Sequence, residues 1–106
     1  MISNIKSQMR KGILEYCILA IISRNEVYAS DILEILKTAE IVVVEGTVYP
    51  LLTRMKNEGL LSYRWQESTG GPPRKYYSLT DDGRTLLNQL SNEWQSICQA
   101  VNQITQ

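Results

Sequence analysis

The feature that most constrains the fold of this chain is a short helical segment, residues 45–59, followed at once by a basic hairpin pattern. Apolar residues in the segment recur at i, i+3, i+4 and i+7, the spacing that buries one stripe of a helix. These residues are Val48, Leu51, Leu52 and Met55. The remaining positions are hydrogen-bonding, aromatic or cationic: Thr47, Tyr49, Thr53, Arg54, Lys56 and Asn57. Such side chains can reach phosphates and base edges from the major groove, although an ordinary solvated helix face has a similar composition.

Two extended patterns follow this helix. Gly59 ends it, and residues 60–67 alternate, so that Leu61, Tyr63 and Trp65 are expected on one half-buried face. Residues 74–79 resume the extended pattern, with the run from Ser68 to Pro73 between the two. We expect a β-hairpin whose connection is too long for a two-residue turn.

The tip of this hairpin combines flexible backbone with positive charge. Gly70 and Gly71 permit a close approach of the backbone to a phosphate chain, and two prolines stiffen the run that follows. Arg74 and Lys75 place two cations beside it. Chance could produce such a pairing, but a helix and a basic hairpin in this order favour a winged helix that reads DNA.

Three runs in this region resemble the PadR family of bacterial transcription regulators. They are Gly46-Thr47-Val48-Tyr49-Pro50-Leu51-Leu52, Glu58-Gly59-Leu60-Leu61 and Gly70-Gly71-Pro72-Pro73-Arg74-Lys75-Tyr76-Tyr77. The resemblance covers almost the whole chain. It implies a winged-helix protein whose third helix enters the major groove, whose wing follows the DNA backbone, and whose C-terminal helix mediates dimerisation.

The same resemblance implies DNA-contact candidates: Thr47, Tyr49, Arg54, Arg74 and Lys75. Upstream, residues 27–33 resemble the start of the family's second helix. Ala29 and Ser30 stand where the family usually has a small residue or glycine followed by a variable residue, which is a mild departure.

Length and composition predict one small unit. With 106 residues, 43% of them hydrophobic and 21% charged, the chain can bury a single core. We expect a mostly helical α+β fold, a winged helix-turn-helix over residues 1–79 with a C-terminal dimerisation helix over residues 80–106. No apolar run is long enough to cross a bilayer, and residues 1–8 lack the apolar stretch of a secretory signal. The sequence therefore predicts a cytoplasmic protein without a membrane partner.

Other segments complete the expected organisation. The first helix is predicted to be heavily buried, through Ile13, Leu14, Cys17, Ile18, Ile21 and Ile22. The second begins near Tyr28, with Ser30 or a neighbour as its cap, and its apolar face is formed by Ile32, Leu33, Ile35 and Leu36. The β-branched run at residues 41–44 is expected to pair with the hairpin as a third strand.

Charge is distributed unevenly, although the net charge is zero. Residues 46–79 carry five cations and two anions, whereas residues 80–106 carry one cation and three anions. The positive excess thus coincides with the proposed reading elements, and Lys6, Arg10 and Lys11 in the first helix are available for flanking phosphates. Binding to DNA should be sensitive to salt, because each neutralised phosphate releases counterions.

The last helix carries a coiled-coil pattern. Thr80 is its predicted N-cap, and Asp81 and Asp82 suit the positive end of its dipole. Apolar residues then alternate in steps of three and four: Leu87, Leu90, Trp94, Ile97, Val101 and Ile104. Such a stripe requires a covering surface, and we favour a second copy of the chain over folding back onto the same domain.

Trp94, in the middle of the apolar stripe of the last helix, is a candidate residue for a ligand site. An indole in a seam of aliphatic residues could leave an apolar slot between protomers, bordered by Leu90 and Ile97. In small PadR regulators a tryptophan at a similar point stacks on flat hydrophobic drugs, so the resemblance implies a possible effector site. The alternative is a plain interface anchor, since tryptophan is enriched at interfaces without any ligand.

Catalysis is the function that the residues support least. The sequence lacks histidine, a nucleophile motif, a phosphate-binding loop and a metal-ligand cluster, so we expect neither an enzyme nor a metal or other cofactor. Cys17 and Cys98 are far apart and lack metal spacing, and they are interpreted as reduced core residues rather than a redox switch.

These observations favour a homodimeric, DNA-binding repressor that reads a palindromic operator. A flat hydrophobic effector at the dimer interface is a possible means of relieving the repression. The expected DNA contacts are Thr47, Tyr49, Thr53, Arg54, Lys56, Gly70, Gly71, Arg74, Lys75 and Lys11. The rival interpretation is a winged helix used only for protein contacts, since this fold is reused in that way.

Overall fold

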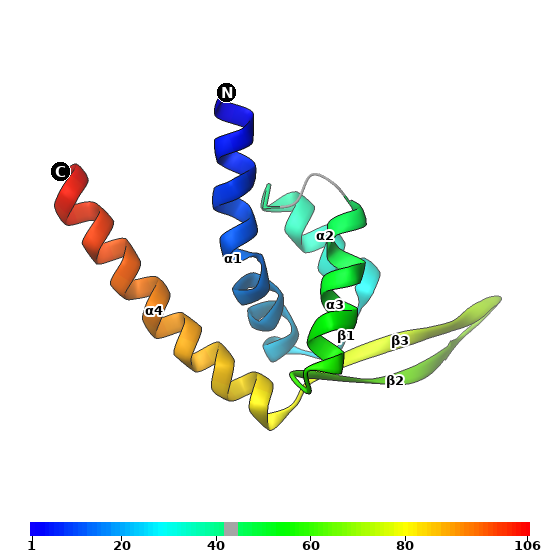
Figure 1. Cartoon of the computed structure of the whole chain (residues 1–106). Coiled ribbons are helices and arrows are strands. Elements are labelled where there is room, and N and C mark those ends of the chain that lie inside the picture. Colours follow the sequence, from blue (N-terminus) through cyan, green and yellow to red (C-terminus); the bar gives the residue numbers. More distant parts are fainter. Residues whose placement is uncertain (42–44) are drawn as a thin grey trace.

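The computed structural model describes residues 1–41 and 45–106 of the chain. Within them the elements follow the order α1 (Ile2–Arg24), β1 (Val27–Tyr28), α2 (Ala29–Thr38), the short 3₁₀ helix η1 (Glu45–Thr47), α3 (Val48–Asn57), β2 (Leu61–Ser68), β3 (Gly71–Leu79) and α4 (Asp81–Thr105). Figure 1 shows α1, α2 and α3 gathered together, with the hairpin and α4 projecting in different directions. The mostly helical α+β fold expected from the sequence is confirmed.

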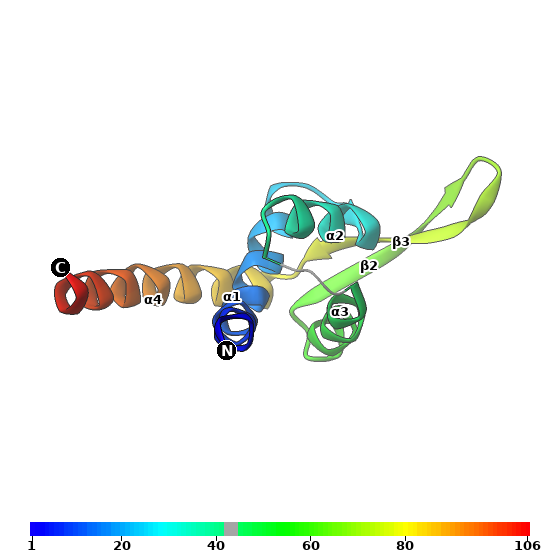
Figure 2. The ribbon, with the colours of Figure 1, turned by 90° about the horizontal axis from the view of Figure 1, so that it is seen from above.

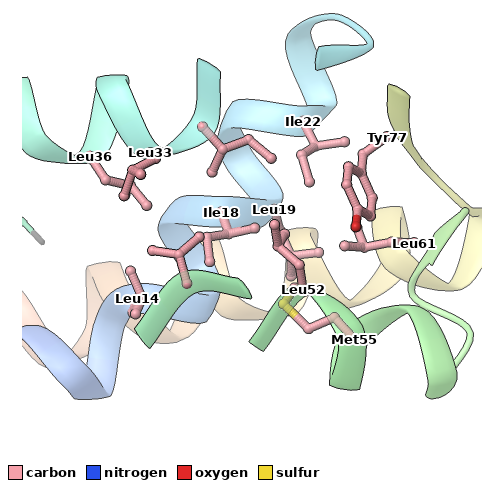
Figure 3. Packing of buried hydrophobic residues seen from close by; sticks show 12 residues of the cluster. Leu14, Ile18, Leu19, Ile22, Leu33, Leu36, Leu52, Met55, Leu61 and Tyr77 are labelled. Atoms are coloured by element: carbon pink, nitrogen blue, oxygen red, sulfur yellow. The ribbon is translucent and has the colours of Figure 1, made fainter. Parts of the chain in front are cut away.

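The core lies where α1, α2, α3 and the base of the hairpin meet. It is formed by Leu14, Ile18, Leu19, Ile22, Ile32, Leu33, Leu36, Val48, Leu52, Met55, Leu61 and Tyr77. In Figure 3, side chains from α1 lie between those of α2 and those of α3. Full burial of one such aliphatic side chain contributes about 1.5–3 kcal/mol, so this cluster fixes how α3 sits against the rest of the domain.

The predicted apolar stripe of α3 is correct. Val48, Leu52 and Met55 are fully buried and Leu51 is half-buried. Gly59 ends the helical segment with a φ of 80°, a left-handed conformation that costs glycine little. The amide of Leu60 then donates to the carbonyl of Met55, which turns the chain directly into β2.

The hairpin is longer and its connection tighter than expected. Ser68 pairs with Gly71, so only Thr69 and Gly70 connect the strands, and Gly70 takes a φ of 79°. The prediction of a connection too long for a two-residue turn was therefore wrong. Pro72 and Pro73 belong to β3, where a register shift between Gln66 and Ser68 of β2 accommodates residues that cannot donate a ladder hydrogen bond.

The third strand of the described sheet also differs from the expectation. β1 pairs with β3, with Val27 opposite Tyr77 and Tyr28 opposite Tyr76, giving the antiparallel order β1-β3-β2. Ile41 lies outside any strand, and the rest of the segment predicted for this role, residues 42–44, lies outside the described residues. A two-residue strand between helices leaves almost no alternation in the sequence, which is why β1 was missed.

Two side chains predicted to be covered are exposed instead. Ile35 on α2 is 47% exposed, because the core contacts of that helix are made by Ile32, Leu33 and Leu36. Trp65 is 62% exposed, because β2 extends beyond the core after Tyr63.

The junction into α4 is held by Thr80, as predicted. Its hydroxyl oxygen accepts from the amide of Gly83 at 3.0 Å and lies 2.6 Å from the carbonyl oxygen of Gly59. The start of α4 is thereby attached to the end of the α3 segment. Leu87 and Leu90 still pack against the core, and beyond them α4 leaves the domain and diverges from the N-terminal half of α1 (Figure 1).

Candidate nucleic-acid interface

The polar face of α3 is exposed, as its sequence predicts. Thr47, Tyr49, Thr53, Arg54, Lys56 and Asn57 all lie on the surface. Thr53 donates its hydroxyl to the carbonyl of Tyr49 at 3.2 Å, a bond that orients the side chain along the helix. The apolar stripe and the polar face are therefore separated on α3 as a reading helix requires.

A groove of about 350 Å³ separates α3 from the start of α2 and the hairpin. It is lined by Tyr28, Ala29, Ser30, Tyr49, Thr53, Trp65, Arg74, Lys75 and Tyr77, a set called the reading groove below. In Figure 2, α2 and α3 lie beside the base of the hairpin, with the strands running between them in this view. The only charged residues in this lining, as the structure describes it, are the cations Arg74 and Lys75, so the groove suits a polyanion.

Four of the nine residues that line the groove were predicted to contact DNA, and five were not. Tyr49 and Thr53 come from α3, and Arg74 and Lys75 from β3. The five others are Tyr28, Ala29, Ser30, Trp65 and Tyr77. Tyr28, Ala29 and Ser30 come close to the hairpin because β1 pairs with β3. This pairing joins distant segments and cannot be predicted from the local sequence.

Aromatic rings hold the cations of the hairpin in place. The Lys75 ammonium lies 4.7 Å from the ring centroid of Tyr63 and 5.7 Å from that of Trp65. Lys56 of α3 approaches the same Tyr63 ring at 5.6 Å. Arg74 lies over Tyr28 at 5.0 Å. These contacts restrain long side chains while leaving their charge available to an anion.

Arg54 is placed differently from the other cations of α3. Its guanidinium donates to Glu58 at 2.6 Å and to Glu15 of α1 at 3.1 Å. The hydrogen bonds to these two carboxylates, that to Glu58 first, raise the pKa of Arg54 above its ordinary value. The side chain stays exposed, but it lies at the α1 side of α3 and does not line the reading groove.

Arg64, counted above in the positive excess, also has an acidic partner. Its Nε donates to Glu26 at 3.0 Å, and its guanidinium stacks over Tyr76 at 4.8 Å. The uncompensated positive charge of the region is thus concentrated on Lys56, Arg74 and Lys75, among the residues that the structure describes.

The remaining predicted DNA contacts lie outside the groove. Gly70 forms the hairpin turn and Gly71 begins β3, both at the exposed tip. Lys11 is exposed on α1, in the half of that helix that points away from the hairpin (Figure 1).

The predicted seam of α4 divides into two parts. Leu87 and Leu90 are half-buried against the core, whereas Trp94, Ile97, Val101 and Ile104 are exposed. The surface around Trp94 is lined only by α4 residues, among them Gln95 and Cys98. In a single copy of the chain, Trp94 and Ile97 therefore form an uncovered surface rather than an enclosed pocket.

The chain belongs to the transcriptional regulator PadR-like family, whose characteristic sequence pattern matches residues 18–89. A PadR-like transcription factor from Bacteroides fragilis is 57% identical, with 96% of this chain and 99% of that one covered and a TM-score of 0.78. A PadR-like transcriptional regulator from Bacillus cereus is 42% identical, with 93% and 97% covered and a TM-score of 0.82.

A more distant structure includes DNA. Bacillus subtilis PadR, solved in complex with operator DNA, is 26% identical, with 74% of this chain and 45% of that chain covered and a TM-score of 0.68. Together with the family match, this identifies the protein as a DNA-binding transcriptional regulator with a winged helix, and not an enzyme. No helix within residues 1–41 and 45–106 is long and apolar enough to span a membrane.

Proposed function

We propose that the protein is a homodimeric repressor that reads a palindromic operator. The observation that carries this proposal is the reading groove, in which the exposed face of α3 and the cations of the wing, strands β2 and β3, face one space. A helix that enters the major groove and a hairpin that follows the backbone need this arrangement, because one sets the sequence preference and the other the register.

Individual roles follow from chemistry and position. Thr47 and Tyr49 at the start of α3 and Thr53 in its middle carry groups that read base edges, while Arg54 and Lys56 in its second half reach toward phosphates. Arg74 and Lys75, with the backbone of Gly70 and Gly71, follow the DNA backbone. Lys11 reaches flanking phosphates from α1.

The wing provides the direct test of DNA binding. Fluorescence anisotropy of a labelled duplex from upstream of the protein's own gene is measured at several salt concentrations, against a scrambled duplex. The double variant Arg74→Ala, Lys75→Ala should lose about tenfold or more in affinity for both duplexes and reduce the salt slope by about two. A matched double variant, Arg24→Ala, Arg84→Ala, removes two exposed cations outside the reading groove and should change both quantities less.

Replacing Tyr49 or Thr47 should have a different effect. These variants are expected to change the ratio of affinities for the two duplexes, because base contacts specify sequence and phosphate contacts do not. Parent-like binding by the wing double variant would refute the assignment and favour a winged helix that contacts proteins.

The proposed dimer is supported by the exposed apolar residues of α4. Residues 80–106 would form the dimerisation unit and residues 1–79 the DNA-binding unit, so that two reading helices meet half-sites about one helical turn apart. Analytical ultracentrifugation of the parent and of Val101→Asp tests this. The parent should sediment as a dimer and the variant as a folded monomer, and a monomeric parent at micromolar concentration would refute the dimer.

The proposed function includes an effector site at Trp94. Between two copies of α4, Trp94 with Leu90 and Ile97 could border a slot for a flat hydrophobic molecule. Such a molecule would weaken DNA binding only by the extent to which it prefers the non-binding arrangement of the two reading helices. Titration of planar aromatic cations against the indole fluorescence of Trp65→Phe, in which Trp94 is the remaining tryptophan, tests the site. Unchanged Trp94 emission in a protein that still binds DNA would refute it.

A further inference from the structure

Trp65 is exposed at a place where the fold does not require an aromatic side chain. It lies on β2 beyond the last core residues and is 62% exposed. Its neighbour Tyr63 meets it edge-on, with ring centroids 5.8 Å apart and an interplanar angle of 87°. One side of the indole thus packs against the Tyr63 ring, while more than half of the side chain faces solvent.

The surroundings of Trp65 are cationic and aromatic. Trp65 pairs across the hairpin with Lys75, whose ammonium lies 5.7 Å from the indole centroid. Both residues line the reading groove, and Tyr49 of α3 lines it too. The acidic residue that follows along β2, Glu67, is exposed and is not part of the lining. The positive charge of the lining makes a nucleic-acid strand the matching occupant.

We infer that Trp65 is itself a DNA contact, which packs its indole against the sugars of the strand running between α3 and the wing. This inference rests on the proposed binding of DNA by the reading groove. Lys75 neutralises a phosphate of that strand, and the indole beside it covers the apolar part of an adjacent nucleotide. Every deoxyribose presents an apolar face, and contacts to the sugars carry no sequence information directly, so this contact does not depend on the bases.

Trp65 therefore contributes affinity rather than discrimination between bases. Trp65→Ala should weaken binding about tenfold, to the upstream and the scrambled duplex alike, because apolar burial is lost, and should leave the salt slope unchanged because no charge is lost. Lys75→Ala should instead lower the salt slope by about one. Ile35→Ala, which removes an exposed apolar side chain of α2 outside the groove, serves as the matched control and should bind as the parent does.

Fluorescence distinguishes direct contact from an indirect effect. The chain has two tryptophans, so Trp94→Phe leaves Trp65 as the single reporter and Trp65→Phe leaves Trp94. When the upstream duplex binds, Trp65 should become less accessible to acrylamide, whereas the accessibility of Trp94 on the projecting α4 should change much less.

The outcomes separate this inference from the proposed function. If the parent and Ile35→Ala bind DNA but Trp65→Ala binds equally well, and Trp65 stays accessible to acrylamide in the complex, Trp65 is not a contact and the proposed function stands. If the parent binds neither duplex at low salt, the proposed function and the inference both fail. Loss of affinity in Trp65→Ala together with a lowered salt slope would also overturn the inference, since it would show that Trp65 acts only by positioning Lys75.

Discussion

Arg54 on α3 and Glu15 on α1 are joined by an ion pair, with Nη2 of the arginine 3.1 Å from Oε2 of the glutamate. A second carboxylate, that of Glu58 one turn further along α3, takes Nη1 of the same guanidinium. Arg54 thus bridges α3 to α1, and two anions surround the cation that sequence analysis placed among the DNA contacts.

This bridge predicts that Glu15→Gln strengthens DNA binding. Removal of one anion beside α3 makes the local potential more positive and releases part of the Arg54 guanidinium toward phosphate. The affinity should rise a few-fold at low salt, and the advantage should fade as salt increases. Anisotropy titrations of parent and variant with the upstream duplex measure both effects. Weaker binding by Glu15→Gln would show that the bridge is needed to position α3.

The Arg54 bridge also illustrates what could be predicted from the sequence. The stripe of α3, the order of helix and hairpin, and Thr80 as a cap were all predicted, because each depends on residues a few positions apart. The third strand, the partners of Arg54 and the exposure of Trp65 were missed, because each depends on where distant segments meet. The reading groove joins α2, α3 and the hairpin. The local sequence therefore predicted Tyr49 on the helix and Lys75 on the hairpin, but not their neighbour Tyr28.

A close contact at the start of α4 predicts a marked loss of stability in Gly83→Ala. A β-carbon on Gly83 would lie 2.1 Å from the carbonyl oxygen of Leu60, which is backbone and cannot rotate away. We expect a loss of about 1–3 kcal/mol in the free energy of unfolding, the range for overpacked sites. Chemical denaturation monitored by circular dichroism measures it.

Gly12→Ala is the matched control for Gly83→Ala. Gly12 lies within α1, and a β-carbon there would meet nothing within 4 Å. Alanine should therefore increase the free energy of unfolding by about 0.5–1 kcal/mol, because glycine is a poor helix former. If both variants were equally stable, the tight junction between Leu60 and α4 would be contradicted.

Thr80 predicts a second, chemically specific effect at that junction. Its hydroxyl oxygen accepts from the amide of Gly83, while its single proton can be donated to the carbonyl of Gly59 or of Leu60. Thr80→Ala should cost about 1–2 kcal/mol, because it removes the cap and the link to the α3 segment together. Thr80→Ser keeps the hydroxyl and should recover most of the loss in the same denaturation experiment. An equal loss of unfolding free energy in both variants would indicate that the methyl group of Thr80, and not its hydroxyl, stabilises the junction.

Cys17 predicts a pH dependence of stability. The thiol is half-buried in α1, and burial raises its pKa above the ordinary value of 9.0. The unfolded chain therefore releases this proton at lower pH than the folded protein does, so the free energy of unfolding should fall as the pH rises past the ordinary thiol pKa. Cys17→Ala removes the ionisable group and should flatten the decline between about pH 9 and 10, the interval between the ordinary pKa values of cysteine and tyrosine. Because the thiolate is the nucleophile, alkylation of Cys17 at pH 8.5, followed by mass spectrometry, should also be slower than that of free glutathione. A rate equal to that of glutathione, or an unchanged pH profile in Cys17→Ala, would contradict the burial of this thiol.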